Sequence, residues 1–133
     1  MTASTRERTG TGERTGLFSV LAGLAALAIL LQGVWAGIFI RQGEAYDGTW
    51  VTVHARGAEV AIALALAAAV VAVWKLRSRR DLVIGSVVLV LLLAFEAYLG
   101  GEIFGRPGMQ VLHFTLALGL MGLAVWLPVR ARR

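Results

Sequence analysis

The sequence has no cysteine, and this absence removes several classes of chemistry. Disulfide bonds, thiolate metal sites, cysteine nucleophiles and covalent c-type haem attachment are all excluded. Phosphate-binding loops, HExxH pairs and GxSxG elements are also missing. Charged residues make up only 16% of the 133 residues, whereas hydrophobic residues make up 58%, with a mean hydropathy of +0.75. This composition is typical of a single-domain membrane protein.

Four apolar stretches are long enough to cross a lipid bilayer. A helix rises 1.5 Å per residue and therefore needs about 20 residues to cross about 30 Å of hydrocarbon. Helices are required because a backbone in lipid must satisfy its own hydrogen bonds. We therefore predict an all-α, integral membrane four-helix up-and-down bundle over residues 16–129. Its predicted spans are about 17–40, 50–74, 82–104 and 109–127.

The lysines and arginines indicate the orientation of the bundle. Most of them lie in three hydrophilic segments, residues 6–14, 75–80 and 130–133, whereas the other two connections contain only Arg41 and Arg106. Cytoplasmic loops are enriched in basic residues, so we predict a multi-pass protein of the cell membrane with both termini cytoplasmic. The net charge of +5 then needs no nucleic-acid partner.

The ends and connections of the chain are strongly polar. Residues 1–15 have almost no apolar side chains and are predicted to form a disordered cytoplasmic tail, and residues 130–133 form a basic cytoplasmic end. The connection from Arg77 to Asp81 is short, which makes the second and third helices antiparallel neighbours. Pro107 is suited to the start of the fourth helix.

The spans contain both histidines of the chain, His54 and His113. His54 follows Trp50 by four residues and His113 follows Met109 by four residues, so both lie roughly 6 Å below the starts of two parallel helices. Parallel helices can lie diagonally in a bundle, where two facing imidazoles suit the axial coordination of one haem iron. The alternative is two unrelated histidines that bind loops or lipid headgroups. Two histidines alone make a poor zinc site, although a carboxylate could complete one.

Small residues occur near these histidines and on the other spans. They allow either a flat macrocycle or another helix to approach the backbone closely. The candidates for such close packing are Gly33, Gly37, Gly57 and Gly100.

Three arginines are candidates for contacts with haem propionates, because a guanidinium group binds a carboxylate through two hydrogen bonds. Arg56 lies two residues from His54, and Arg41 and Arg106 flank the outer openings. Alternatively, Arg56 reaches lipid headgroups or pairs with Glu59 three residues further on.

Two carboxylates, Glu59 and Glu96, lie deeper in the spans. They are nine and eight residues from the outer span ends at Trp50 and Phe104, so antiparallel neighbours can bring them to one level. Two close carboxylates in a low dielectric share a proton, which would make a proton relay. The alternative for each is a hydrogen bond to Arg56 or to a nearby hydroxyl group.

Several short motifs resemble the four-helix halves of haem A synthases. Leu31-Gln32-Gly33 through Gly37 to Gly43 resembles their first helix, and Tyr98-Leu99-Gly100-Gly101 resembles their third. His54-Ala55-Arg56, and Val111-Leu112-His113-Phe114 with Ala117, resemble the segments that carry the paired haem ligands of that family. The resemblance covers about residues 17–128 and implies a bis-histidine haem b in the outer half of the bundle.

The resemblance does not imply synthase activity. The reactive half of the family has a glutamate shortly before the histidine of the second helix, whereas here Trp50-Val51-Thr52-Val53 precede His54. Three hypotheses follow: a haem b protein for electron transfer, redox sensing or service in a respiratory complex; a haem-free membrane scaffold or partner subunit; and a proton-coupled transporter. A homodimer through Gly33 and Gly37, or a larger membrane complex, is also compatible with the sequence.

Overall fold

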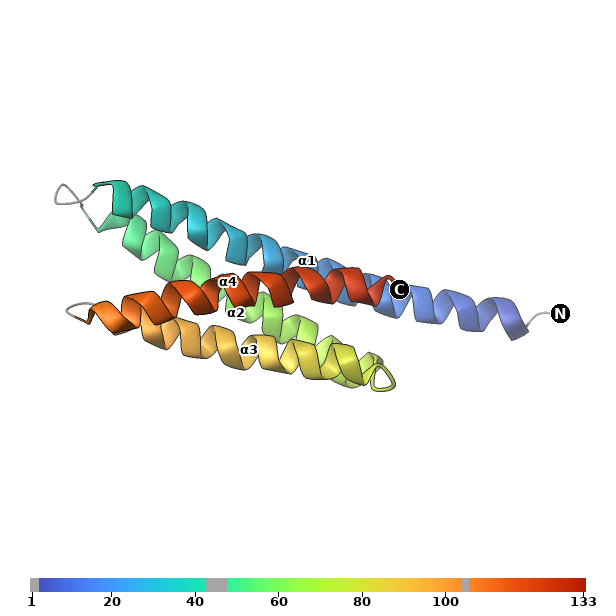
Figure 1. Ribbon diagram of the computed structural model, residues 1–133. Coiled ribbons are helices and arrows are strands. Elements are labelled where there is room, and N and C mark those ends of the chain that lie inside the picture. The colour runs from blue at the N-terminus through green and yellow to red at the C-terminus, as the bar shows by residue number, and fades with distance from the viewer. Residues whose placement is uncertain (1–2, 43–47, 104–105) are drawn as a thin grey trace.

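The chain folds into four consecutive helices in the computed structural model, which describes residues 3–42, 48–103 and 106–133 (Figure 1). No strand occurs among these residues. All four helices are long and apolar enough to cross a membrane, which confirms the prediction of an all-α bundle with four candidate spans. The helices are α1 (Ala3–Gln42), α2 (Thr49–Lys75), α3 (Arg80–Gly101) and α4 (Pro107–Ala131).

The helix boundaries differ from the predicted spans mainly at the ends. Helix α1 begins at Ala3, so its backbone is helical through most of the segment for which the sequence predicts a disordered tail. A nucleated helix gains one hydrogen bond for each added residue, which favours extension beyond the apolar segment. Helix α3 ends at Gly101, and residue 104 of the predicted third span lies outside the described residues. Pro107 is the first residue of α4, as predicted.

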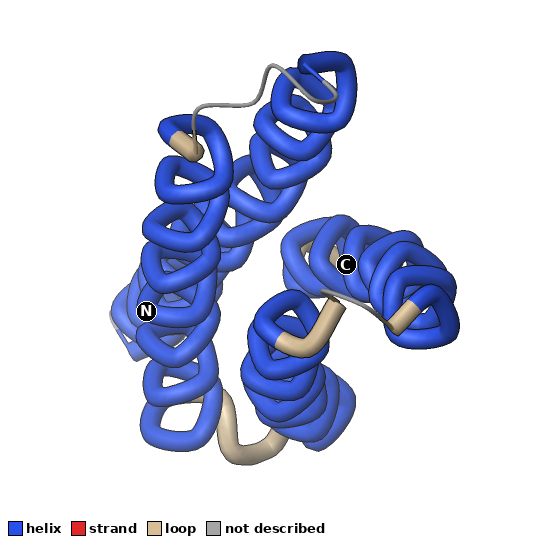
Figure 2. The backbone as a smooth tube through the Cα atoms, turned by 90° about the vertical axis from the view of Figure 1, so that its left-hand side faces the viewer, coloured by secondary structure: helices blue, strands red, loops and turns tan. Residues whose placement is uncertain are grey.

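Each helix packs against two neighbours, in the cyclic order α1, α2, α3, α4 (Figure 2). The helix pairs α1 with α3 and α2 with α4 are therefore the diagonals. The α2–α3 connection lies at the same end of the bundle as the C-terminus (Figure 1). We call this the basic end, because residues 75–80 and 130–133 lie there, and we call the opposite end, with Gly48 and Arg106, the distal end.

The hydrophobic core fills the half of the bundle next to the basic end. Helix α2 contributes alanines, so its neighbours approach it closely, α3 contributes leucines, and α1 and α4 contribute both alanines and larger side chains. The spacing of three or four residues places each set on one face of its helix. The fully buried core residues include Phe18, Ala25, Ala61, Ala65, Ala72, Leu82, Leu89, Leu120, Ala124 and Leu127.

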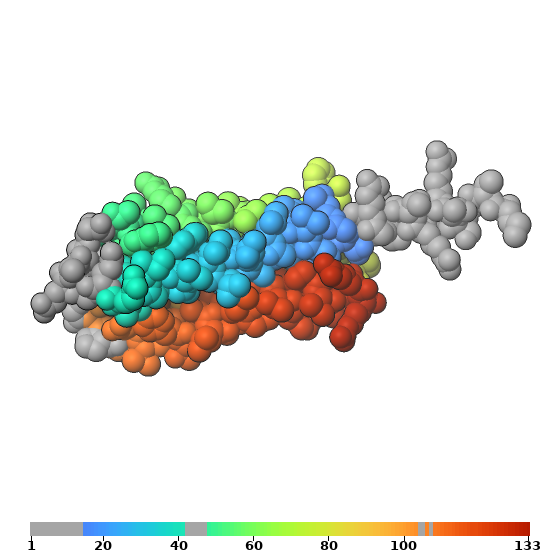
Figure 3. Space-filling model, turned by 90° about the horizontal axis from the view of Figure 1, so that it is seen from above, coloured from blue at the N-terminus to red at the C-terminus, as the bar shows by residue number. Residues whose placement is uncertain are grey.

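The distal half is packed more loosely. No side chain of α4 from residue 108 to residue 119 is buried, whereas Leu120, Ala124, Leu127 and Ala131 are. The α1–α2 pair and the α3–α4 pair also diverge toward the distal end (Figures 1 and 2). In the view from above, α1 and α4 lie side by side over most of the bundle (Figure 3).

Ion pairs fasten α3 to α4 at the basic end. Asp81 Oδ2 lies 2.7 Å from Arg130 Nε, and Asp81 Oδ1 lies 3.5 Å from Arg79 Nε. Arg79 also donates a hydrogen bond of 3.0 Å to the carbonyl oxygen of Arg130. These contacts and the core hold this end of the bundle together.

Candidate functional site

One polar residue from each helix contributes to a group in the distal half, which we call the polar cluster. Its members are Gln32 of α1, His54 of α2, Glu96 of α3 and His113 of α4. Polar groups are expensive in a membrane interior and usually face the centre of a bundle. Four such residues at one level therefore mark the most distinctive site of the molecule.

His54 is held by the backbone of α1. Its Nδ1 lies 3.1 Å from the carbonyl oxygen of Gln32, and because a carbonyl oxygen only accepts, Nδ1 carries the hydrogen. The ring also meets Phe39 edge-on, with 5.6 Å between the ring centres. These contacts fix the imidazole and leave Nε2 as its lone-pair nitrogen.

His113 is held by α3. Its Nδ1 lies 3.1 Å from Glu96 Oε1, although the two atoms are not aligned as a hydrogen bond. The ring rests on the backbone at Gly100, where a Cβ atom would lie only 3.2 Å from His113 Cε1. The absence of a side chain at Gly100 therefore gives the imidazole its place between α3 and α4.

The two imidazoles meet across the diagonal of the bundle. Their ring centres lie 6.4 Å apart, and the ring planes are inclined at 67°. The sequence predicts both histidines at one depth on diagonal helices, and the structure has this arrangement. The Nδ1 atom of His54 is hydrogen-bonded to α1 and that of His113 lies 3.1 Å from an oxygen of α3, so the two Nε2 atoms are the candidate metal ligands.

Glu96 is the buried acid of the site. Only 8% of the residue is exposed, and neither carboxylate oxygen has a hydrogen-bond partner. The Oε1 atom of Gln32 is also buried without a partner, while its Nε2 donates to the carbonyl oxygen of Ala28. Buried polar atoms are usually satisfied, so these atoms indicate a site with unused capacity for polar interactions.

The candidate small residues divide into two groups. A Cβ atom at the buried Gly57 would collide with the indole ring of Trp35 and lie 2.5 Å from Gln32 Nε2, so this glycine lets α1 pack against α2 beside the cluster. Gly100 accommodates His113, as described above. Gly33 and Gly37 are exposed, and nothing lies within 4 Å of a Cβ atom at either position.

The candidate propionate contacts lie outside the cluster. Arg56 donates two hydrogen bonds to Glu59, at 3.0 and 2.9 Å, and both side chains are largely exposed. This is the alternative arrangement that the sequence suggested for Arg56. Arg106 pairs with Glu102 at 2.6 Å, and Arg41 is exposed in the last turn of α1.

The structure does not bring Glu59 and Glu96 together. Glu59 is 64% exposed and bound to Arg56, whereas Glu96 is buried beside His113. Within the described residues, a relay built on the pair of carboxylates therefore has no support, and Glu96 is the carboxylate associated with the histidines.

Sequence reasoning missed one member of the site and one contact between two others. It did not assign a role to Gln32, whose signal is an amide side chain in an otherwise apolar span. It also did not connect Glu96 with His113, although neighbouring antiparallel helices carry them. The signal for this pair was the inward-facing row of α3, which contains Glu96 together with Leu89, Leu93 and Leu99.

No known protein family matches the chain, and no curated protein or solved structure is significantly similar to it. Among the described residues, no three His, Asp or Glu side chains come together as a metal-binding group. A metal held by this cluster would therefore need ligands beyond the protein, as the iron of a porphyrin has.

Proposed function

We propose that this chain is a membrane haem b protein with His54 and His113 as the axial ligands. The observation that carries the proposal is the geometry of the two rings. Imidazoles on opposite sides of one metal ion, with metal–nitrogen bonds of about 2 Å, have ring centres about 6 Å apart. The two rings of this protein lie 6.4 Å apart.

The surroundings of the rings also fit a bound haem. Histidine ligands usually donate a hydrogen bond from their other nitrogen to a carbonyl or carboxylate oxygen; His54 does so with Gln32, and Glu96 Oε1 lies 3.1 Å from Nδ1 of His113. The looseness of α4 from residue 108 to residue 119 reduces the packing that a flat macrocycle must displace. The residues present therefore fit the group.

The chain's own residues would set the properties of such a site. Haem iron bound by two histidines supplies one-electron redox chemistry. His54 and His113 would hold the iron as its two protein ligands, which would suit electron transfer, redox sensing or an accessory role in a respiratory complex better than catalysis at the iron. Glu96 would place an oxygen beside Nδ1 of His113, where it would help to orient that ligand.

The proposed haem site agrees with the resemblance to one half of a haem A synthase, but the proposed function does not include the synthase reaction. No glutamate precedes His54 within the first turns of α2, so we propose a haem carrier without synthase activity. We further propose that the protein lies in the cell membrane with the basic end cytoplasmic, because basic residues concentrate there. The cluster then lies in the outer half.

The optical spectrum of the detergent-purified protein tests the proposal. Cells supplied with a haem precursor should yield protein with a Soret band and a reduced spectrum of the six-coordinate, low-spin type. His54→Ala and His113→Ala should each abolish that spectrum. Thr115→Ala is a matched control on α4, because its hydroxyl bonds only to its own helix, at the carbonyl oxygen of Val111.

Size-exclusion profiles and helical circular dichroism distinguish loss of ligand from loss of fold. His113→Met adds a second check, since methionine can ligate haem iron and changes the reduced spectrum without removing the sixth ligand. Colourless protein that takes up no added haemin contradicts the proposal. A spectrum that survives both histidine substitutions contradicts the choice of ligands.

A haem-free scaffold or partner subunit is the second candidate. It is favoured by the interhelical contacts that the cluster makes by itself: His54 joins α2 to α1, and His113 joins α4 to α3. Polar contacts of this kind hold helices together in membranes. In that case the histidine variants should lower the unfolding temperature of a protein that shows no haem spectrum in any form.

A further inference from the structure

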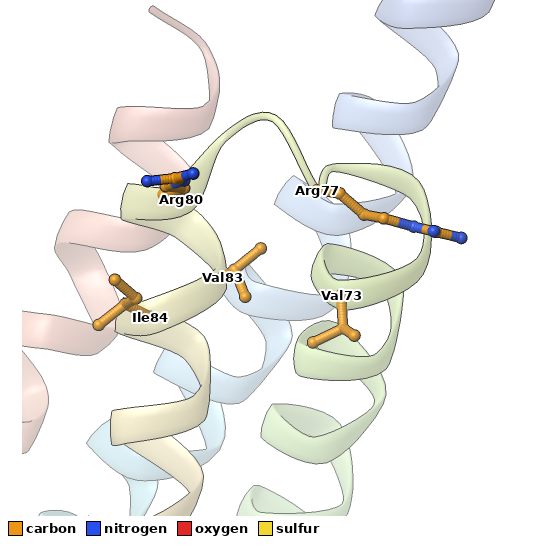
Figure 4. A pocket seen from close by; sticks show the side chains of 5 residues that line it. All are labelled: Val73, Arg77, Arg80, Val83 and Ile84. Carbon is orange, nitrogen blue, oxygen red and sulfur yellow. The ribbon is translucent and has the colours of Figure 1, made fainter.

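A shallow depression lies between α2 and α3 at the basic end (Figure 4). Val73 and Arg77 line it from α2 and its connection, and Arg80, Val83 and Ile84 line it from α3. Arg80 and Arg77 lie on opposite sides of the depression, with the Arg77 side chain extended away from Arg80, and the branched apolar side chains lie below them (Figure 4). Its position is at the opposite end of the bundle from the polar cluster.

The floor of the depression is apolar and open. Val73 is 49% exposed, Ile84 is 63% exposed, and the neighbouring Trp74 is 70% exposed. These residues lie in the terminal turns of two helices that qualify as membrane spans. An exposed tryptophan at such a position is typical of the boundary between hydrocarbon and headgroups. The floor therefore faces acyl chains close to the level of the lipid phosphates.

The rim of the depression carries uncompensated positive charge. Asp81, the acidic residue of the first turn of α3, pairs with Arg79 and Arg130. Within the described part of the chain, neither Arg77 nor Arg80 has a carboxylate partner, and Arg77 makes only a hydrogen bond of 3.4 Å from Nε to the carbonyl oxygen of Trp74. The terminal nitrogens of both guanidinium groups are thus available to an anion.

We propose that this depression is a binding site for an anionic phospholipid. One acyl chain lies against Val73, Val83 and Ile84, and the headgroup phosphate is bound by Arg80 and by Arg77, whose exposed side chain turns toward the depression to reach it. Guanidinium groups bind phosphate through charge-assisted hydrogen bonds, and basic residues beside a span attract anionic lipids. The combination of an apolar floor with a cationic rim matches a ligand that has both parts. The site is independent of any haem.

Quenching of Trp74 by brominated lipids measures binding at this site. The protein is reconstituted into phosphatidylcholine vesicles that contain either dibrominated phosphatidylglycerol or dibrominated phosphatidylcholine. The glycerol lipid should quench more strongly at equal content, and Trp74→Phe identifies the fluorescence that comes from this position. Arg77→Gln with Arg80→Gln should lower the preference for phosphatidylglycerol about tenfold.

Arg132→Gln with Arg133→Gln is the matched control. It removes the same charge at the same end of the bundle, from exposed residues outside the depression, and should keep the preference. Equal losses in the two double variants would show diffuse attraction to the basic end and overturn the proposal. A wild-type protein without a preference would overturn it as well.

Soluble glycerol phosphate distinguishes a lipid site from a phosphate site. An excess of this compound lacks the acyl chains and should leave the quenching by brominated phosphatidylglycerol unchanged. Complete displacement would mean that the arginines bind free phosphate without the apolar floor, which also overturns the proposal. The circular dichroism of each variant checks that the bundle is intact.

Discussion

The imidazole rings of His54 and His113 lie 6.4 Å apart, although α2 and α4, which carry them, are diagonal helices and not neighbours. The remaining two helices hold the rings in place, α1 through the carbonyl oxygen of Gln32 and α3 through Glu96. Every helix therefore contributes to one site, and a change on α1 or α3 is expected to reach the histidines.

Glu96 provides the most direct test of this arrangement. We expect Glu96→Leu to lower the affinity for haem about 10–100-fold, because it removes the oxygen beside His113 Nδ1. Glu96→Gln keeps an acceptor there and should have a smaller effect. Haemin titration followed in the Soret region gives both affinities. Equal affinities for both variants and the wild type would mean that Glu96 does not position His113.

Gly57 should tolerate no side chain. Gly57→Ala places a methyl group against Trp35 and Gln32, and overpacking of this kind costs about 1–3 kcal/mol. Thermal unfolding in detergent should show a lower midpoint for this variant. The indole is the larger obstacle, so the additional change Trp35→Leu should restore part of the loss.

Gly33→Ala is the control for that experiment, because a Cβ atom there has no neighbour within 4 Å. Its unfolding midpoint should stay at the wild-type value. A Gly33→Ala variant as unstable as Gly57→Ala would show that the glycines act through something other than the α1–α2 contact.

The exposed pair of Arg56 and Glu59 should behave as a unit. Breaking a pair leaves one charge on a membrane-facing helix, whereas removing both leaves none. We therefore expect Arg56→Gln and Glu59→Gln each to reduce the yield of membrane-inserted protein more than the double variant does. Quantification of the protein in isolated membranes measures this, and additive losses would contradict the expectation.

The absence of cysteine allows a clean test of orientation. Ser78 lies exposed at the basic end, and Gly108 lies exposed at the distal end with space for a side chain. With the basic end in the cytoplasm, a membrane-impermeant maleimide should label Gly108→Cys on intact cells. It should label Ser78→Cys only after the cells are opened. The reverse pattern would invert the proposed topology.

Composition and length alone predicted the helices, because an uninterrupted apolar run in a membrane has few other folds. The positions of the span ends were less predictable. Helix α1 continues to Ala3 and α4 continues to Ala131 through polar residues, where helical hydrogen bonding extends without an apolar requirement. No compositional signal identifies those end points.

The sequence predicted how deep each candidate site residue lies in its span, but not in every case which side of the helix it lies on. Counting residues along a span gives depth, and this placed His54 and His113 at one level. The same count placed Glu59 near Glu96, but Glu59 follows His54 by five residues, which turns it about 140° around the helix. The buried row of Gly57, Ala61, Ala65 and Ala68 marks the inward face of α2, and Glu59 is not on that face. Depth and facing direction must be combined.

The unequal packing of the two halves has a mechanical consequence. The bundle is tightly packed at the basic end and loosely packed at the distal end, so separation of the helices at the distal end disturbs few core contacts. Backbone amides near His54 and His113 should then exchange with solvent faster than those near Leu89 and Leu127, because local opening is easiest where little is buried. Under the proposed function, haem would enter and leave at the distal end, between the diverging helix pairs (Figure 1), while the contacts at the basic end stay intact.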